Sequence, residues 1–219
     1  MDFLHVSLVV KNLAKFHAFS LVAEKLYPEK FNDIKRALSK DVQYSDLNSI
    51  PNSLIWYFNA SVSVITDPGR KPVEVVLVDY QLARFASPAT DISYFLYMSA
   101  NYDFLSKYYD QLLDIYYGTM AGILRQCDID IQETFPRHIL HDHLKEYSVL
   151  GLVEALISMK IVTAESEEAQ KMLEMKHQVP NGLHEFETQN QIMFVERVNG
   201  IVKFFFERNF TLDGVIIEQ

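Results

Sequence analysis

Helical periodicity runs through most of this chain and limits what it can fold into. The opening stretch repeats one set of mainly apolar side chains at three- and four-residue steps: Val6, Val9, Leu13, Phe16, Ser20 and Ala23. This spacing places them on one face of a helix, which Pro28 is expected to end. Further helices are predicted over residues 29–40, 92–100, 104–126, 138–162 and 185–209.

One segment departs from the helical pattern. Two β-branched runs, residues 61–65 and 73–78, flank the turn sequence TDPGR, and this arrangement predicts a β-hairpin. The helix that follows is expected to be capped by Thr90 or Asp91. The expected fold class is therefore α+β, a mainly helical body with one β-hairpin.

Length and composition predict a single domain over residues 1–219, because 49% hydrophobic and 13% aromatic residues can build a core. The net charge is −9 and no basic run is present, so neither a nucleic-acid nor a membrane partner is expected. Cys127 is the only cysteine, which excludes a disulfide within the chain. Asp2 and His5 do not fit a signal peptide, and Ser148–Val162 is too short and too charged for a membrane span. A cytoplasmic location is predicted.

Asp79 is the first candidate functional residue, because it follows the predicted hairpin at the end of an apolar run. In kinase-like folds a carboxylate at such a strand end holds Mg²⁺ between the nucleotide phosphates. Phosphoryl transfer needs this metal because it neutralises charge that develops on the transferred group. An aspartate that only caps a turn is the alternative, and for an isolated Asp it is the more common one.

The residues around Asp79 favour the functional interpretation. Residues 75–91 (VVLVDYQLARFASPATD) and 94–96 resemble the "DFQ…sPatDl.yfL" signature of the ecdysteroid kinase-like (CHK kinase-like) family, which is related to choline and aminoglycoside kinases. Residues 13–20 (LAKFHAFS) resemble that family's "LA.fHA.S" helix. Residues 116–117 resemble its "Yy" helix, and residues 147–156 (YSVLGLVEAL) its late "yGl..al" helix. The resemblance covers nearly the whole chain in the family's order.

This resemblance implies a kinase-like large (C-terminal) lobe and an ATP-dependent phosphotransferase acting on a small-molecule alcohol of the sterol or choline type, with ATP and Mg²⁺ as cofactors. Asn59 and Asp79 would hold the metal, and Gln81 belongs to the same motif. His17 would pack and hydrogen-bond behind the catalytic loop. Asp91 would order the region of the active site, although helix capping explains it equally well.

The catalytic aspartate is missing from the stretch that aligns with the family's H-G-D-x-W-x-x-N loop. Residues 52–59 (NSLIWYFN) keep Trp56 and Asn59, but Leu54 stands where the aspartate would accept the hydroxyl proton. The seven glycines never lie closer than four residues apart, so no glycine-rich phosphate loop can form. We therefore expect a large lobe whose small lobe is missing and which has no catalytic residue.

Three functions remain open for such a chain. It could be an active phosphotransferase, a pseudokinase-type ligand-binding or regulatory domain that keeps Asn59 and Asp79, or a truncated splice or gene-model fragment without activity. The last two are favoured, because two essential parts are absent. The expected partners are a small alcohol or sterol and a protein bound at an apolar face that the missing lobe uncovers, bordered by residues 54–58.

Two further groups of residues have simpler explanations. The histidines at positions 138, 141 and 143 are not expected to bind zinc, because no cysteine or carboxylate completes a tetrahedral set. The tyrosines between residues 94 and 117 are expected to lie in the core and at its rim. In the family this helical surface borders the substrate site, so some of these rings could line a sterol-sized pocket.

Overall fold

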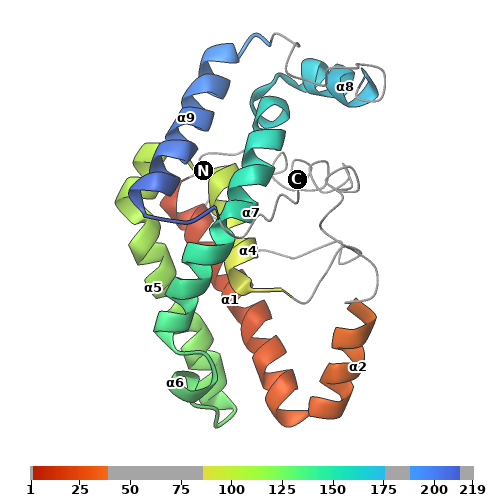
Figure 1. The fold of residues 1–219 in the computed structure, drawn as a ribbon, viewed down its shortest axis with the longest axis vertical. Helices are drawn as coiled ribbons and strands as arrows, with labels where there is room; N and C mark the ends of the chain where they lie inside the picture. The colour runs from red at the N-terminus through yellow and green to blue at the C-terminus, as the bar shows by residue number, and fades with distance from the viewer. Residues whose placement is uncertain (1, 39–85, 176–187, 213–219) are drawn as a thin grey trace.

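A computed structural model describes residues 2–38, 86–175 and 188–212 of the chain (Figure 1). This part is 85% helical and contains no strand. Its helices are α1 (Phe3–Leu26), α2 (Pro28–Leu38), α4 (Pro88–Ser99), α5 (Tyr102–Gln126), α6 (Ile131–Thr134), α7 (Arg137–Thr163), α8 (Ser166–Met175) and α9 (Gln191–Glu207).

The mainly helical prediction is confirmed, whereas the α+β class is wrong for the described residues, which form helices without a sheet. The predicted hairpin, residues 61–78, lies outside those residues. The α+β class was predicted from two short β-branched runs alone. β propensity measures how well a side chain fits a half-buried sheet surface, so it does not establish a class alone.

Helix α1 begins where Asp2 caps it, with the Asp2 Oδ1 accepting a 3.0 Å hydrogen bond from the His5 backbone N–H. It ends at Leu26, with only Tyr27 before Pro28 starts α2, as the sequence predicted. Its buried face differs from the predicted one, since Val10, Ala14 and Ala18 are buried while Phe16 is 38% exposed. The helix carries apolar residues on most of its circumference, so spacing alone did not identify the face that packs.

By length and composition, α1 is also apolar enough to cross a membrane, and it is the one such helix among the described residues. Several of its side chains instead belong to the protein core, because Val6, Val10 and Leu13 join the same buried cluster as residues of α4 and α5. A core helix satisfies the same length and composition test as a membrane span.

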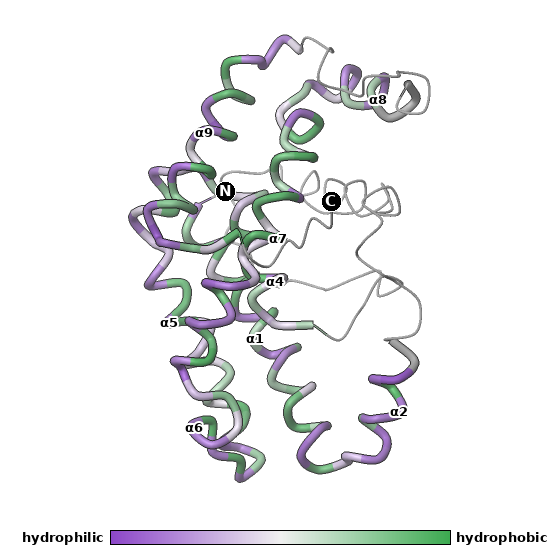
Figure 2. The backbone as a smooth tube through the Cα atoms, in the orientation of Figure 1, coloured by the Kyte–Doolittle hydropathy of each residue, from purple (hydrophilic) through white to green (hydrophobic). Residues whose placement is uncertain are grey.

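Five helices form the central body, with α4 between α1 and α7 (Figure 1). Helix α5 packs against α1, and α9 packs against both α5 and α7. Figure 2 shows hydrophobic and hydrophilic residues alternating along these helices, and buried apolar side chains of all five belong to one cluster. The largest fully buried side chains of this core include Tyr97, Tyr109, Tyr116, Ile92, Leu96 and Phe205. The prediction that several of the tyrosines lie in the core is confirmed.

Helix α4 begins one residue after Ser87, whose Oγ accepts a 3.2 Å hydrogen bond from the Ala89 N–H. The predicted caps Thr90 and Asp91 are therefore wrong, because both lie inside the first turn. Pro88 occupies the first helical position, where its missing N–H costs no hydrogen bond and its fixed φ suits a helix. The dipeptide Ser87-Pro88 was the stronger start signal.

The other end of α4 is held by α9. The Arg197 Nη2 donates hydrogen bonds to the carbonyl oxygens of Tyr97, at 3.3 Å, and Met98, at 3.1 Å. A cation near a helix C-terminus is favourable because it faces the negative end of the helix dipole. Arg197 thereby ties the last turn of α4 to α9.

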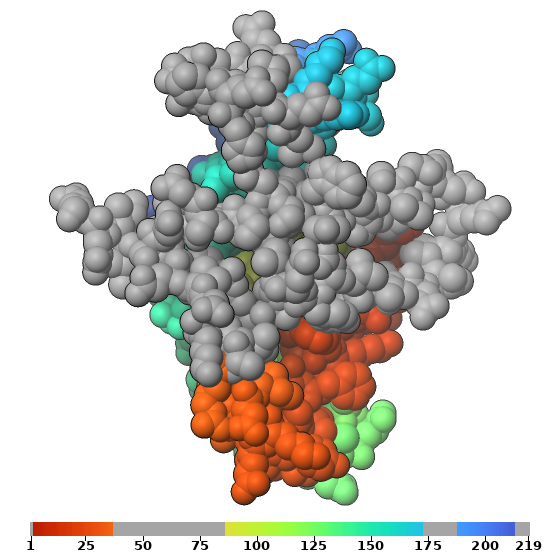
Figure 3. Space-filling view, turned by 90° about the vertical axis from the view of Figure 1, so that its right-hand side faces the viewer, coloured from red at the N-terminus to blue at the C-terminus, as the bar shows by residue number. Residues whose placement is uncertain are grey.

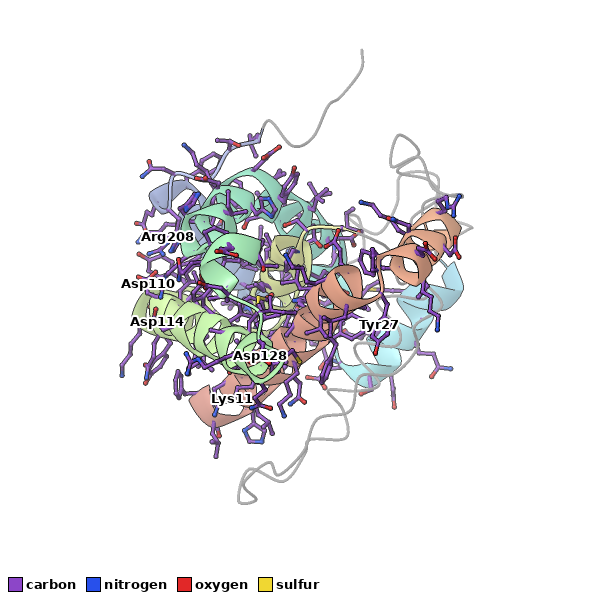
Figure 4. The ribbon with its side chains drawn as sticks, turned by 90° about the horizontal axis from the view of Figure 1, so that it is seen from below. Lys11, Tyr27, Asp110, Asp114, Asp128 and Arg208 are labelled. Carbon is purple, nitrogen blue, oxygen red and sulfur yellow. The ribbon has the colours of Figure 1, made fainter. Side chains whose placement is uncertain are left out.

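Helix α9 is also fastened to α5 by a charged pair. The Arg208 guanidinium binds both carboxylate oxygens of Asp110 and lies 4.8 Å from the centre of the Tyr109 ring. Figure 4 shows Arg208 beside Asp110, with Asp114 further along α5. Asp114 pairs with Arg137 at the start of α7. These ion pairs connect three helices on one side of the molecule.

Candidate functional site

His17 and Asp91 come together although 74 residues separate them. The His17 Nε2 lies 2.9 Å from the Asp91 Oδ2. His17 is buried on α1, and Asp91 lies in the first turn of α4. The "LA.fHA.S" and "sPatDl" segments are thus joined through these two side chains.

Tyr116 of α5 completes this group, with its hydroxyl oxygen 2.7 Å from the His17 Nδ1. Burial, followed by the nearby Asp91 charge, raises the pKa of Tyr116 well above its ordinary value, so the hydroxyl keeps its proton. In the neutral tautomer that fits both neighbours, Tyr116 donates to Nδ1 and the Nε2–H donates to Asp91. His17 therefore links a buried hydroxyl to a carboxylate.

The Asp91 carboxylate faces outward, since its side chain is 56% exposed. One oxygen bonds to His17, and the carboxylate has further lone pairs that can accept hydrogen bonds. Its place in the first turn of α4 is favourable for a negative charge, because the helix dipole is positive there. His17 and Tyr116 can therefore hold the exposed Asp91 carboxylate in one orientation, and the functional roles of His17 and Asp91 stay predictions.

The remaining predicted site residues lie outside the described residues. They are Leu54, Trp56, Asn59, Asp79 and Gln81. The proximity of Asn59 and Asp79, and the apolar face near Trp56, therefore stay predictions. In the sequence, Gln81 precedes Ser87, the N-cap of α4, by six residues, and Asp91 follows Ser87 by four.

The three neighbouring histidines differ in their surroundings. The His143 Nδ1 lies 2.9 Å from the Ser87 Oγ, so His143 supports the start of α4. The His141 Nε2 accepts a 3.4 Å hydrogen bond from the Arg137 Nε, and His138 is exposed. Within residues 2–38, 86–175 and 188–212, no group of three or more potential ligand side chains could hold a metal ion.

Sequence reasoning missed Glu154, a half-buried carboxyl on α7. Burial raises the pKa of Glu154. It also raises the pKa of Tyr94 to about 12, with a smaller contribution from the Glu154 charge. Both residues lie near the contact between Gly151 and α4. The "yGl..al" resemblance covered position 154, but nothing in the residue pattern indicated that this glutamate would be half-buried.

Sequence reasoning also missed Tyr116 as the partner of His17, although the Tyr-Tyr motif had already marked the position.

The family model that matches this chain is described as the ecdysteroid kinase-like family, and it covers residues 1–63 and 62–129. Comparisons with curated proteins and with solved structures found no match. The matched residues make up more than half of the chain and include His17, Asp91 and Tyr116. The chain belongs to the ecdysteroid kinase-like family.

Proposed function

We propose that this chain is a kinase-like domain that binds a nucleotide or small alcohol without transferring phosphate, and that it acts as a pseudokinase-type binding or regulatory domain. Family membership supports the coarser part of this proposal, a kinase-like phosphotransferase ancestry. The finer part rests on which of the family's residues this chain keeps and which it has replaced.

The observation that carries the proposal is the link between His17, Asp91 and Tyr116. Three family-like segments, far apart in the sequence, meet in one hydrogen-bonded group. A buried polar network is costly unless its members satisfy one another. Because this group fixes the exposed Asp91 carboxylate at the start of α4, it supports a binding role for that carboxylate.

The loss of transfer activity is inferred from Leu54. A leucine at the position of the catalytic aspartate can neither accept the hydroxyl proton nor orient the attacking oxygen. Loss of a general base typically lowers the rate about a hundred- to ten-thousand-fold. The glycines of these 219 residues are also too widely spaced to form a phosphate-binding loop.

Asn59 and Asp79 are the residues that would hold Mg²⁺. Their side chains offer an amide oxygen and a carboxylate, and Mg²⁺ prefers such hard oxygen ligands. When bound, Mg²⁺ neutralises negative charge on the nucleotide phosphates. The roles of this chain's own residues are then to bind the cation through Asn59 and Asp79 and to support the neighbouring segment through His17 and Asp91.

Isothermal titration of ATP with and without Mg²⁺ tests the binding role, with Asp79→Ala as the matched variant. We expect Mg²⁺-dependent binding that is weakened in Asp79→Ala. Radiolabelled phosphate transfer to a panel of sterols and choline tests the inactivity. We expect no turnover, and no rescue by Leu54→Asp.

Two results would overturn the proposal. Turnover by the unmodified chain that disappears in Asp79→Ala would make the protein an active phosphotransferase. Absence of a binding signal in titrations of ATP and of each alcohol in the panel would remove the binding role and favour a product without activity of its own.

A further inference from the structure

Two tyrosine hydroxyls and one serine hydroxyl lie buried between the central helices. They belong to Tyr97 of α4, Tyr109 of α5 and Ser148 of α7, and none of the three oxygens has a hydrogen-bond partner among the described residues. The three residues are 0%, 2% and 0% exposed. Buried polar atoms in native proteins are hydrogen-bonded with few exceptions, so these hydroxyls call for a partner that the described side chains do not provide.

The three hydroxyls are neighbours. The rings of Tyr97 and Tyr109 both make edge contacts with Phe204 of α9, with ring centres 6.3 Å and 5.0 Å apart. Burial raises the pKa of Tyr97 well above its ordinary value, Tyr109 adds to this rise, and Ser148 opposes it because a neighbouring hydroxyl favours the charged form. The Ser148 Oγ thus lies beside the Tyr97 hydroxyl, although the two do not meet the geometry of a hydrogen bond. We call these three side chains the hydroxyl cluster.

The hydroxyl cluster is electrically neutral. Burial raises the pKa of Tyr97 and of Tyr109, so both keep their protons. Arg208 lies 4.8 Å from the centre of the Tyr109 ring, but its guanidinium donates hydrogen bonds to both carboxylate oxygens of Asp110. Each hydroxyl can donate one hydrogen bond and accept others. A small neutral molecule that also donates and accepts fits such a set better than an ion does.

We propose that one internal water molecule binds at the hydroxyl cluster and bridges α4, α5 and α7. A buried water typically makes about three hydrogen bonds to polar groups that would otherwise be unpaired, and the cluster offers three hydroxyls from three helices. Tyr109 precedes Tyr116 by seven residues, about two turns of α5. The water site is therefore separate from the His17 group, and it does not depend on nucleotide binding.

Oxygen-17 magnetic relaxation dispersion tests the proposal, because its amplitude counts the water molecules that stay inside a protein for longer than the protein takes to tumble. We expect the amplitude of Tyr97→Phe/Ser148→Ala to be lower than that of the wild type by the contribution of one water molecule. A crystal structure of the wild type should show one water oxygen about 2.5–3.0 Å from each of the three hydroxyl oxygens.

The sign of the stability change gives a second test. A hydroxyl that is bonded to water contributes to stability, so Tyr97→Phe and Tyr109→Phe should each lower the Tm by about 2–4 °C. If the hydroxyls had no partner at all, the same changes would remove a buried polar atom whose burial is unfavourable, and the Tm would rise.

Tyr117→Phe and Tyr27→Phe are the matched controls. The Tyr117 hydroxyl donates directly to the Phe135 carbonyl oxygen at 3.2 Å, so its removal should lower the Tm without changing the dispersion amplitude. Tyr27 is 60% exposed at the junction of α1 and α2, away from Arg208 (Figure 4). Figure 3 shows α2 and the adjoining end of α1 at the lower end of the molecule. Tyr27→Phe should change neither quantity.

An unchanged dispersion amplitude in Tyr97→Phe/Ser148→Ala, or a higher Tm in Tyr97→Phe and Tyr109→Phe, would overturn the proposal. A crystal structure in which the three hydroxyls bond directly to one another would also overturn it. Circular dichroism identifies any variant that fails to fold, and the crystal structure of the wild type then decides the test.

Discussion

Gly151 of α7 lies so close to Ser93 of α4 that a Cβ on the glycine would be 2.6 Å from the Ser93 Oγ and 2.7 Å from its carbonyl carbon. Backbone atoms cannot rotate away, so any larger residue must push the two helices apart. We expect Gly151→Ala to lower the free energy of unfolding by about 1–3 kcal/mol. Urea denaturation monitored by circular dichroism measures the change.

Gly118→Ala is the matched control, because this glycine lies inside α5 and an added methyl group would have open space within 4 Å, apart from its own helix backbone. Alanine should stabilise that helix by about 0.5–1 kcal/mol, since glycine loses more backbone freedom on folding. A Gly151→Ala variant as stable as Gly118→Ala would contradict the close approach of α4 and α7.

His17→Ala is expected to destabilise the fold more than Tyr116→Phe does. Each change leaves one buried group without its partner, the Tyr116 hydroxyl or the His17 Nδ1, which costs about 1–3 kcal/mol. His17→Ala costs more because it also breaks the hydrogen bond to Asp91. The double variant should lose less than the sum of the single losses, because both act on one contact. Thermal and urea unfolding give these values. His138→Ala, at an exposed position, serves as control and should change stability by less than about 0.5 kcal/mol. If the losses of His17→Ala and Tyr116→Phe simply add in the double variant, the two side chains are not coupled.

Asp110→Asn should destabilise the protein at neutral pH but have little effect in acid. The Arg208 hydrogen bonds hold the pKa of Asp110 below its ordinary value of 3.8. The stabilisation is therefore complete above that ordinary pKa and is lost as the pH falls through the folded-state pKa. Tm measured against pH gives the profile, with the exposed Asp142→Asn as control. A constant difference between wild type and Asp110→Asn down to low pH would rule out the ion pair as its cause.

Glu154→Gln is expected to stabilise the protein at neutral pH, the opposite of the effect of Asp110→Asn. Burial raises the pKa of Glu154, so the folded protein binds its proton more tightly than the unfolded chain does. The cost of burying the charge is present above the folded-state pKa and disappears as the pH falls below the ordinary value. A neutral glutamine should raise Tm at neutral pH, and this gain should shrink in acid. Glu196→Gln, on the exposed side of α9, serves as control; a lower Tm for Glu154→Gln at neutral pH would show that the carboxylate has a favourable partner.

Local features of the fold could be predicted from the sequence, whereas contacts between distant segments could not. Pro28 marked the end of α1, because proline disrupts a helix in its immediate neighbourhood. The spacing that suggested Phe16 as a core residue is a pattern of one helix, and which face packs depends on where α5 and α4 lie. The role of His17 followed from the family resemblance, but its Tyr116 partner is 99 residues away and depends on tertiary packing.

Hydrogen bonds from neighbouring helices to both ends of α4 determine how this helix can unfold locally. Ser87 is tied to His143 of α7, and the carbonyl oxygens of Tyr97 and Met98 are tied to Arg197 of α9. Fraying from either terminus must break a contact with another helix, so the usual low-energy route to amide exposure is closed. The backbone amides of α4 are therefore expected to exchange with deuterium only when the whole domain unfolds. Those of α2, which extends beyond the central helices, should exchange through local openings.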